Sequence, residues 1–288
     1  MREPLIDWRQ IEQVAASRGL CVPAFDWGLG RPEFLQAVLA TCRRLDSFAL
    51  FIVWIGAARS YGLRAAVSLV RELAAEAGVP AAICLDHAER EEDLRDAIAA
   101  GFGAVMFDCS GATLEENIAR TRAVVEEAHA AGAVVEAAFG LLGAEGGGGE
   151  QALTEPETAA RFVEETGVDL FVPSVGNRHG LRGVTVPLDW DLIRELRARI
   201  AIPMVLHGGS GIAIAEARRA GELGFRKLNL FTMLHCDYSD SVKAYLAAHP
   251  EARWYQWAEA GREALAQTVE RYLVQLEMAG TASLLARG

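Results

Sequence analysis

The sequence has no cluster of basic residues and no long hydrophobic run. Its 288 residues carry a formal net charge of −11, and lysine and arginine nowhere gather into a patch. Nucleic acids and anionic membrane surfaces reward such patches, so neither is an expected partner. No stretch approaches the roughly 20 apolar residues that span a bilayer. Residues 1–10 also lack the apolar run of a signal peptide.

The five cysteines lack the spacing of a metal-binding or redox motif. They are scattered without a CxxC pair, and three of them lie inside apolar runs. This pattern is typical of buried free thiols in a reducing compartment, so we expect a cytoplasmic protein.

Short apolar segments alternate with helical patterns along most of the chain. Hydrophobic residues make up 51% of the sequence, which allows a large core. Most of the short segments are continuously apolar, as strands covered on both faces are. We expect eight strands, at residues 20–25, 48–55, 81–86, 104–108, 133–139, 170–175, 203–207 and 227–231.

The segments between these strands have the pattern of amphipathic helices. Residues 60–78 repeat apolar positions at the 3.6-residue helical period, and a further helix is expected at residues 254–276, beyond the eighth strand. Eight strand–helix units predict a (β/α)8 TIM barrel formed by residues 1–288 as one domain, with an extra C-terminal helix. An open doubly wound sheet is disfavoured because no GxGxxG turn follows the first strand.

Polar residues stand where several predicted strands end, which is where such barrels carry their active sites. Asp86 and His87 end the third strand, His179 follows the sixth, and His207 ends the seventh. Three converging neutral imidazoles would form a divalent-metal site, with zinc the leading candidate and a position open for a substrate carbonyl. The alternative is that each histidine only hydrogen-bonds a loop. The other three histidines are expected at the surface: His129, His235 and His249.

The seventh strand runs into the glycine-rich turn HGGSG, residues 207–211. Its glycines would let the backbone approach a ligand closely, and Ser210 adds a hydroxyl. A helix is expected to begin near Ile214, and barrels often hold phosphate after strands seven and eight, at a helix N-terminus. The turn therefore indicates a phosphate site.

These motifs together resemble the class II, metal-dependent fructose- and tagatose-bisphosphate aldolase family. The matching segments follow the family's order along nearly the whole chain: VPAFD, CLDHAE, VMFDCS, VEAAFG, VGNRHG, VLHGGSG and KLNLFT. The resemblance implies that His87, His179 and His207 hold one zinc ion per chain. It also implies that Asp86 protonates the acceptor aldehyde oxygen in bond formation and takes that proton back in cleavage.

The same resemblance implies a binding site for the phosphate of a donor similar to dihydroxyacetone phosphate. The phosphate residues would be Gly180, Gly208, Ser210 and Thr232, with Asn229 against the donor hydroxyls. Relatives often bind a monovalent cation near this phosphate, and they are commonly homodimers or homotetramers. We expect the same of this chain.

Several positions depart from the family pattern on the substrate side. Trp54 stands where the family usually has a substrate-contacting serine, and Asp26 where it has an asparagine, so we assign both to an altered substrate pocket; core packing is the alternative for Trp54. Part of the family has a second glutamate in the fifth strand as an alternative metal ligand, and this chain has Ala138 there. We therefore expect one metal site, with Asp108 supporting the site or contacting the substrate. Glu259 occupies the position of an arginine that grips a second phosphate, and an acid there would repel that phosphate.

The loop after the fifth strand carries a proton-transferring glutamate in relatives. Simple alignment puts Gly146 in that position, and Glu145, one residue earlier, is the candidate replacement on a flexible lid. The alternative is a plain surface loop with solvated acids.

The leading hypothesis is a zinc-dependent aldolase, a carbon–carbon lyase that reversibly cleaves a ketose phosphate. Its products would be dihydroxyacetone phosphate, or an analogue, and an aldehyde without the usual terminal phosphate. One alternative is a metal-dependent epimerase or isomerase that uses the same enediolate, and another is a non-catalytic barrel that binds a phosphorylated ligand. Lys227 and Lys243 are the only lysines. Because Lys227 lies in the eighth predicted strand, a lysine-dependent mechanism stays open from the sequence.

Overall fold

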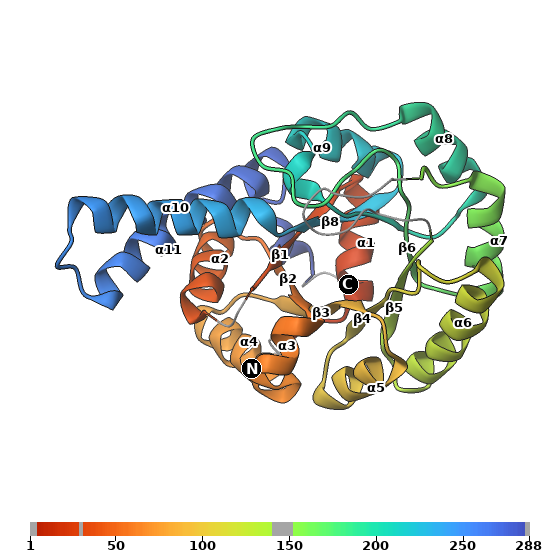
Figure 1. Ribbon diagram of the computed structural model, residues 1–288, viewed down its shortest axis with the longest axis horizontal. Coiled ribbons are helices and arrows are strands. Elements are labelled where there is room, and N and C mark those ends of the chain that lie inside the picture. Colours follow the sequence, from red (N-terminus) through yellow and green to blue (C-terminus); the bar gives the residue numbers. More distant parts are fainter. Residues whose placement is uncertain (1–4, 29–30, 140–151, 286–288) are drawn as a thin grey trace.

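Eight parallel strands close into a barrel in chain order, and β8 pairs back onto β1. The computed structural model describes residues 5–28, 31–139 and 152–285. Helices surround the strands, which confirms the predicted (β/α)8 barrel (Figure 1). The strands are β1 Val22–Asp26, β2 Ala49–Trp54, β3 Ala81–Ala88, β4 Ala104–Phe107, β5 Val134–Ala138, β6 Leu170–Val172, β7 Met204–Leu206 and β8 Phe225–Leu230.

The predicted extra C-terminal helix is present as α11, Trp254–Gln275, and together with the preceding helix α10, Thr232–Ala248, it projects beyond the barrel wall (Figure 1). None of the described helices is long and apolar enough to cross a membrane. The helices are α1 Trp8–Arg18, α2 Pro32–Arg44, α3 Ile55–Tyr61, α4 Leu63–Ala77, α5 Glu91–Ala100, α6 Leu114–Ala130, α7 Pro156–Thr166, α8 Trp190–Arg199, α9 Ile214–Glu222, α10 Thr232–Ala248, α11 Trp254–Gln275 and α12 Thr281–Leu284, with a 3-10 turn η1 at Gly209–Gly211.

The structure differs from the sequence prediction mainly at the ends of elements. The helix expected at residues 60–78 is two helices, α3 and α4, which meet at Gly62, where φ is 87° and ψ is 125°. That combination is accessible to glycine and strained for other residues. Strand β6 stops at Val172 because Pro173 follows and has no N–H to continue the ladder.

The strands are buried because helices cover them outside and their own side chains fill the barrel inside. Every residue of β1 and β5 is buried, although Asp26 and Glu136 are charged. All five cysteines are free, and only Cys236 is partly exposed. Burying a carboxylate costs free energy unless it is paired, so these acids point to interactions at the barrel interior.

Candidate active site

A bulge at the end of β3 brings two neighbouring side chains to the same place. The β3–β4 register shifts between Leu85 and Ala88, and His87 has a φ of 52°, in the left-handed region that non-glycine residues seldom adopt. Strand alternation alone would point Asp86 and His87 to opposite faces. A bulge redirects a side chain, so both residues reach the barrel mouth.

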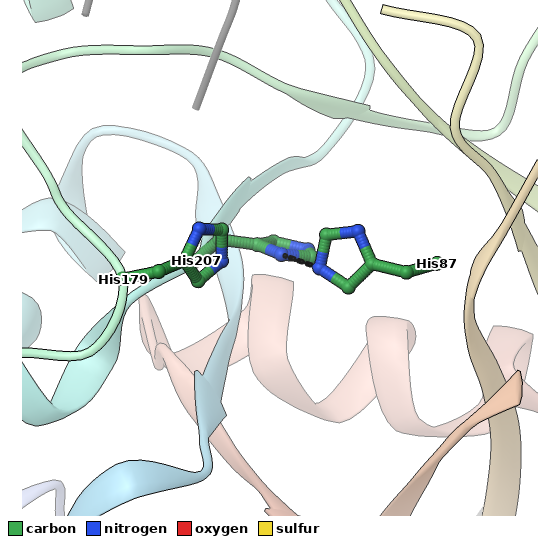
Figure 2. A group of neighbouring side chains, drawn as sticks. All are labelled: His87, His179 and His207. Carbon is green, nitrogen blue, oxygen red and sulfur yellow. Dashed lines mark hydrogen bonds between the residues drawn. The ribbon is translucent and has the colours of Figure 1, made fainter. Parts of the chain in front are cut away.

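Three imidazoles converge at the mouth: His87 from β3, His179 from the loop after β6, and His207 from the end of β7. The Nε2 atom of His87 lies 3.2 Å from Nδ1 of His207. The ring centroid of His179 is 5.4 Å from that of His87 and 5.6 Å from that of His207. The three rings turn toward one another (Figure 2), and one ligand atom from each lies within 4.8 Å of the others. The predicted metal ligands therefore come together.

Two carboxylates fix the orientation of the His87 and His207 rings. Asp108 Oδ2 lies 2.9 Å from His87 Nδ1, and Glu136 Oε1 lies 2.9 Å from His207 Nε2. Each carboxylate accepts an N–H, so the other ring nitrogen offers a lone pair. With His87 protonated, the two facing nitrogens share a hydrogen bond at 3.2 Å; with both rings neutral, their lone pairs can together hold a cation. Tetrahedral zinc, with bonds of about 2.0–2.1 Å, sets its ligand nitrogens roughly 3.4 Å apart, so this donor pair fits a divalent ion.

The surroundings of the His87 ring favour its positively charged form. Burial disfavours the charged form of His87, but the carboxylates of Asp86 and Asp108 outweigh it and raise the pKa of His87 to about 9. Burial also opposes ionisation of Asp108, yet its hydrogen bonds with His87 and Ser110 hold the pKa of Asp108 below its ordinary value. A bound metal ion would take the place of the proton on these rings.

Glu136 is fully engaged by two partners. Its Oε2 accepts a 2.5 Å hydrogen bond from Lys227 Nζ, while Oε1 contacts His207, and all three side chains are about 1% exposed. Glu136, Asp86 and His207 form a second group with metal-ligand spacing. Because both oxygens of Glu136 are occupied, its role is to orient His207, and the geometry suits one metal rather than two.

Lys227 is unsuited to Schiff-base chemistry, the route that the sequence left open. Burial favours the neutral amine, but the contact with ionised Glu136 outweighs it and raises the pKa of Lys227 above its ordinary value. A nucleophilic lysine needs a lowered pKa. Lys227 instead neutralises the carboxylate that supports His207.

Asp86 and Asn229 form a hydrogen-bonded pair beside the imidazoles. Asp86 Oδ1 accepts from Asn229 Nδ2 at 3.1 Å, and the two residues are each 6% exposed. The amide oxygen of Asn229, Oδ1, is buried and accepts no hydrogen bond from the described residues. An unsatisfied buried acceptor at a candidate site is where a ligand hydroxyl would be stabilised.

The predicted phosphate residues lie where η1 meets the start of α10. Ser210 Oγ accepts a hydrogen bond from the backbone N–H of Met233 at 2.9 Å, and Thr232 begins α10. Gly208 of this turn also allows a close approach of two segments of the protein's own backbone. A Cβ on Gly208 would lie 2.3 Å from the carbonyl oxygen of Arg178, so the protein's own backbone, next to His179 and Gly180, fills that space.

The two residues that depart from the family pattern on the substrate side, Trp54 and Asp26, both lie at the barrel mouth. Trp54 ends β2 and is 40% exposed, so core packing does not explain it. Asp26 is 1% exposed; its Oδ1 accepts from the Gly28 N–H at 2.5 Å and lies 3.3 Å from His235 Nε2. Burial raises the pKa of Asp26 in spite of these hydrogen bonds.

The surface prediction for the remaining histidines is correct for His129 and His249 but wrong for His235, which is partly buried. Helix α10 starts directly after β8, so its first turns lie over the barrel mouth. The four-residue spacing from Phe231 to His235 was the available signal, since residues four apart share a helix face. Glu145 lies outside the described residues.

A closed barrel with three imidazoles and a buried carboxylate at its carboxyl-terminal mouth defines an enzyme-like site with a candidate metal centre. The sequence model of the family described as "Fructose-bisphosphate aldolase class-II" matches residues 6–281, and the chain belongs to this family. Members are aldehyde-lyases and are generally metal-dependent, which confirms the predicted enzyme class.

Solved structures agree with this assignment. The YdjI aldolase from Escherichia coli K12 shares 26% identity at a TM-score of 0.83, over 96% of this chain and 99% of that chain. A putative fructose-1,6-bisphosphate aldolase from Coccidioides immitis shares 25% at a TM-score of 0.84, over 95% and 97%. The fructose-bisphosphate aldolase from Campylobacter jejuni, 22% identical with a TM-score of 0.83 over 96% of each chain, supports the fold. The chain is thus a divergent family member.

Proposed function

We propose that this chain is a zinc-dependent aldolase that cleaves a ketose monophosphate into dihydroxyacetone phosphate, or an analogue, and an aldehyde. The observation that carries the proposal is the 3.2 Å approach of His87 Nε2 and His207 Nδ1, each ring backed by a carboxylate. Asp86 stands next to this pair, with Oδ2 4.0 Å from His87 Nε2. Together they supply a cation site and a proton acceptor at one point.

The residues would divide the chemistry as follows. The bound zinc ion would supply a Lewis acid that polarises the donor carbonyl. In cleavage, Asp86 takes the proton from the hydroxyl that becomes the aldehyde oxygen, and the carbon–carbon electron pair stays with the donor fragment. Asn229 Oδ1, which lacks a protein donor, accepts a donor hydroxyl. Glu145 is the proposed source of the proton that the donor carbon then gains.

The donor phosphate would lie between the η1 turn and the first turn of α10. The Ser210 oxygen already accepts from Met233, so its own hydroxyl hydrogen is directed to another acceptor. Gly180, Gly208 and Thr232 would complete this site with backbone amides and a hydroxyl. Anions are stabilised at such helix N-termini.

A second phosphate is disfavoured by how the two candidate replacement arginines pair. Arg262 Nε donates to Glu259, the acid in the family's arginine position, at 2.9 Å. Arg182 is paired with Asp240. Both cations that could replace the missing arginine thus already neutralise carboxylates of this chain, which supports a monophosphate substrate.

The first test is the metal content of tag-free protein by mass spectrometry. We expect about one zinc per chain, lost in the His87→Ala/His207→Ala variant and kept in His129→Ala, whose histidine is at the surface. Retro-aldol assays with ketose 1-phosphates would then follow. Full activity in a His207→Ala variant would contradict the proposal. Deuterium exchange into substrate without cleavage products would point instead to an epimerase or isomerase.

A further inference from the structure

An arc of side chains beside the candidate metal centre has no role in the donor chemistry. Directly paired residues of parallel strands share a face, and so do residues two apart on one strand. Asp26 pairs with Ile52, and Trp54, two residues further on, pairs with Asp86. Asp26, Trp54 and Asp86 therefore line one continuous arc at the barrel mouth.

The same register extends the arc to β8. Ala24 pairs with Asn229, so the positions two residues later, Asp26 and Phe231, also lie next to each other on that face. Trp54 and Phe231 are each 40% exposed, and they give the arc two large apolar surfaces. Asp26 lies between them and is 1% exposed.

His235 completes the arc and is held on several sides. Its ring centroid lies 4.4 Å from that of Phe231 and 5.0 Å from that of Phe34. The ring also covers Gly28, where a Cβ would come within 1.8 Å of the imidazole. The remaining contact is with Asp26, 3.3 Å from Nε2. A ring confined in this way presents its polar atoms in one orientation.

We propose that Asp26, Trp54, Phe231 and His235, the acceptor group, bind the aldehyde half of the substrate and select an uncharged polyhydroxy aldehyde. This inference rests on the proposed aldolase function and names its acceptor class. The Asp26 carboxylate accepts from one substrate hydroxyl, and the second ring nitrogen of His235, Nδ1, pairs with a neighbouring hydroxyl. The aromatic faces cover the carbon skeleton, as in small-molecule sites lined by apolar surface with few polar groups.

The charges around the arc disfavour an anionic aldehyde. The imidazole of His235 faces Asp26 and so offers no free cation to a phosphate or carboxylate. The arginine after β1, Arg31, lies 3.8 Å from Glu33 and donates to a tyrosine hydroxyl at 3.0 Å. The arginine after β2, Arg59, donates to Asp93 at 3.1 Å. Each arginine would have to break its pairing with a carboxylate before it could bind an anion.

The test separates the acceptor from the donor by using zinc-loaded enzyme in the condensation direction. Solvent deuterium exchange into dihydroxyacetone phosphate alone measures the donor half-reaction. Condensation is then measured with D-glyceraldehyde, glyceraldehyde 3-phosphate and propanal. We expect exchange, and a kcat/KM for D-glyceraldehyde at least about tenfold above that for each other aldehyde, because unpaired polar groups penalise analogues that lack the hydroxyl.

Two variants test whether the acceptor group sets this preference. Asp26→Asn replaces the carboxylate with an amide, and His235→Phe keeps the ring stacking but loses both ring nitrogens. In both, the D-glyceraldehyde preference should fall by about tenfold, and condensation should fall more than exchange does. His129→Phe is the matched control, because His129 Nε2 lies 2.9 Å from Asp169 in a partly exposed pair. It should match wild type.

The outcomes distinguish the acceptor proposal from the aldolase function on which it rests. Exchange together with a preference for glyceraldehyde 3-phosphate or propanal would overturn the acceptor proposal and leave the aldolase intact. An unchanged preference in both variants would also overturn it. No exchange at all in zinc-loaded wild type would refute the proposed function, and the acceptor assignment with it.

Discussion

Glu136→Gln should weaken both the fold and the metal centre, by two separable routes. The substitution leaves the ammonium of Lys227 buried at 1% exposure without an ionised partner. Breaking a buried ion pair from one side costs about 3–5 kcal/mol of unfolding free energy. It also takes from His207 the carboxylate that holds its Nε2–H at 2.9 Å. Losing such support of a metal ligand lowers metal affinity about 10–100-fold.

The double variant Glu136→Gln/Lys227→Met separates the two routes. It removes both buried charges, so most of the lost stability should return, whereas the metal affinity should stay low because His207 still lacks its carboxylate. Unfolding in urea of chelator-treated protein measures stability, and competition with a chromophoric chelator measures zinc affinity. Glu127→Gln, in an exposed pair 2.6 Å from Arg95, is the control and should change neither quantity.

Two results would refute this reasoning. Zinc affinity that recovers in the double variant would mean that Glu136 acts through stability and not through His207. A single Glu136→Gln variant that unfolds at the wild-type urea midpoint would mean that the Lys227 charge is solvated or lost without cost. Either result would remove the argument that the buried Lys227–Glu136 pair serves the metal ligand.

Three further outcomes are expected. Gly28→Ala should destabilise the protein by about 1–3 kcal/mol and displace His235, because φ is 46° and the new Cβ would meet the ring; urea unfolding and the aldehyde preference measure the two effects. Gly208→Ala should cost more than about 1 kcal/mol against the carbonyl of Arg178, whereas Gly103→Ala, with open space around it, should be nearly neutral in the same unfolding assay. Removing zinc held at about 100 times its Kd should lower the unfolding free energy by about 2.7 kcal/mol, and an unchanged melting temperature would contradict a folded-state site.

Local patterns were enough to predict the barrel and the cluster of histidines at its mouth. Eight continuously apolar segments alternating with helical stripes are characteristic of strands covered on both faces. Because parallel strands end at one rim, polar residues at their carboxyl ends meet there, and His87, His179 and His207 could be grouped without knowing any distance. The resemblance then added the role of Asp86.

Interactions across the barrel could not be predicted in this way. His235 was expected at the surface because its spacing from Phe231 indicates a shared helix face but not the partner on that face, and Asp26 lies more than 200 residues earlier. The contact of Lys227 with Glu136 joins β8 to β5 through the barrel interior. The conformation of His87 depends on a bulge whose position only the β3–β4 register shows.

The sequence by itself therefore determined the fold class, the family and the residues gathered at the mouth, because periodicity and strand ends are local properties of a chain. The tertiary structure decided which nitrogens face each other, which acids support them, and which residues lie together in the proposed acceptor group. Those features depend on strand register and barrel closure, which set side-chain distances between segments that no local pattern connects.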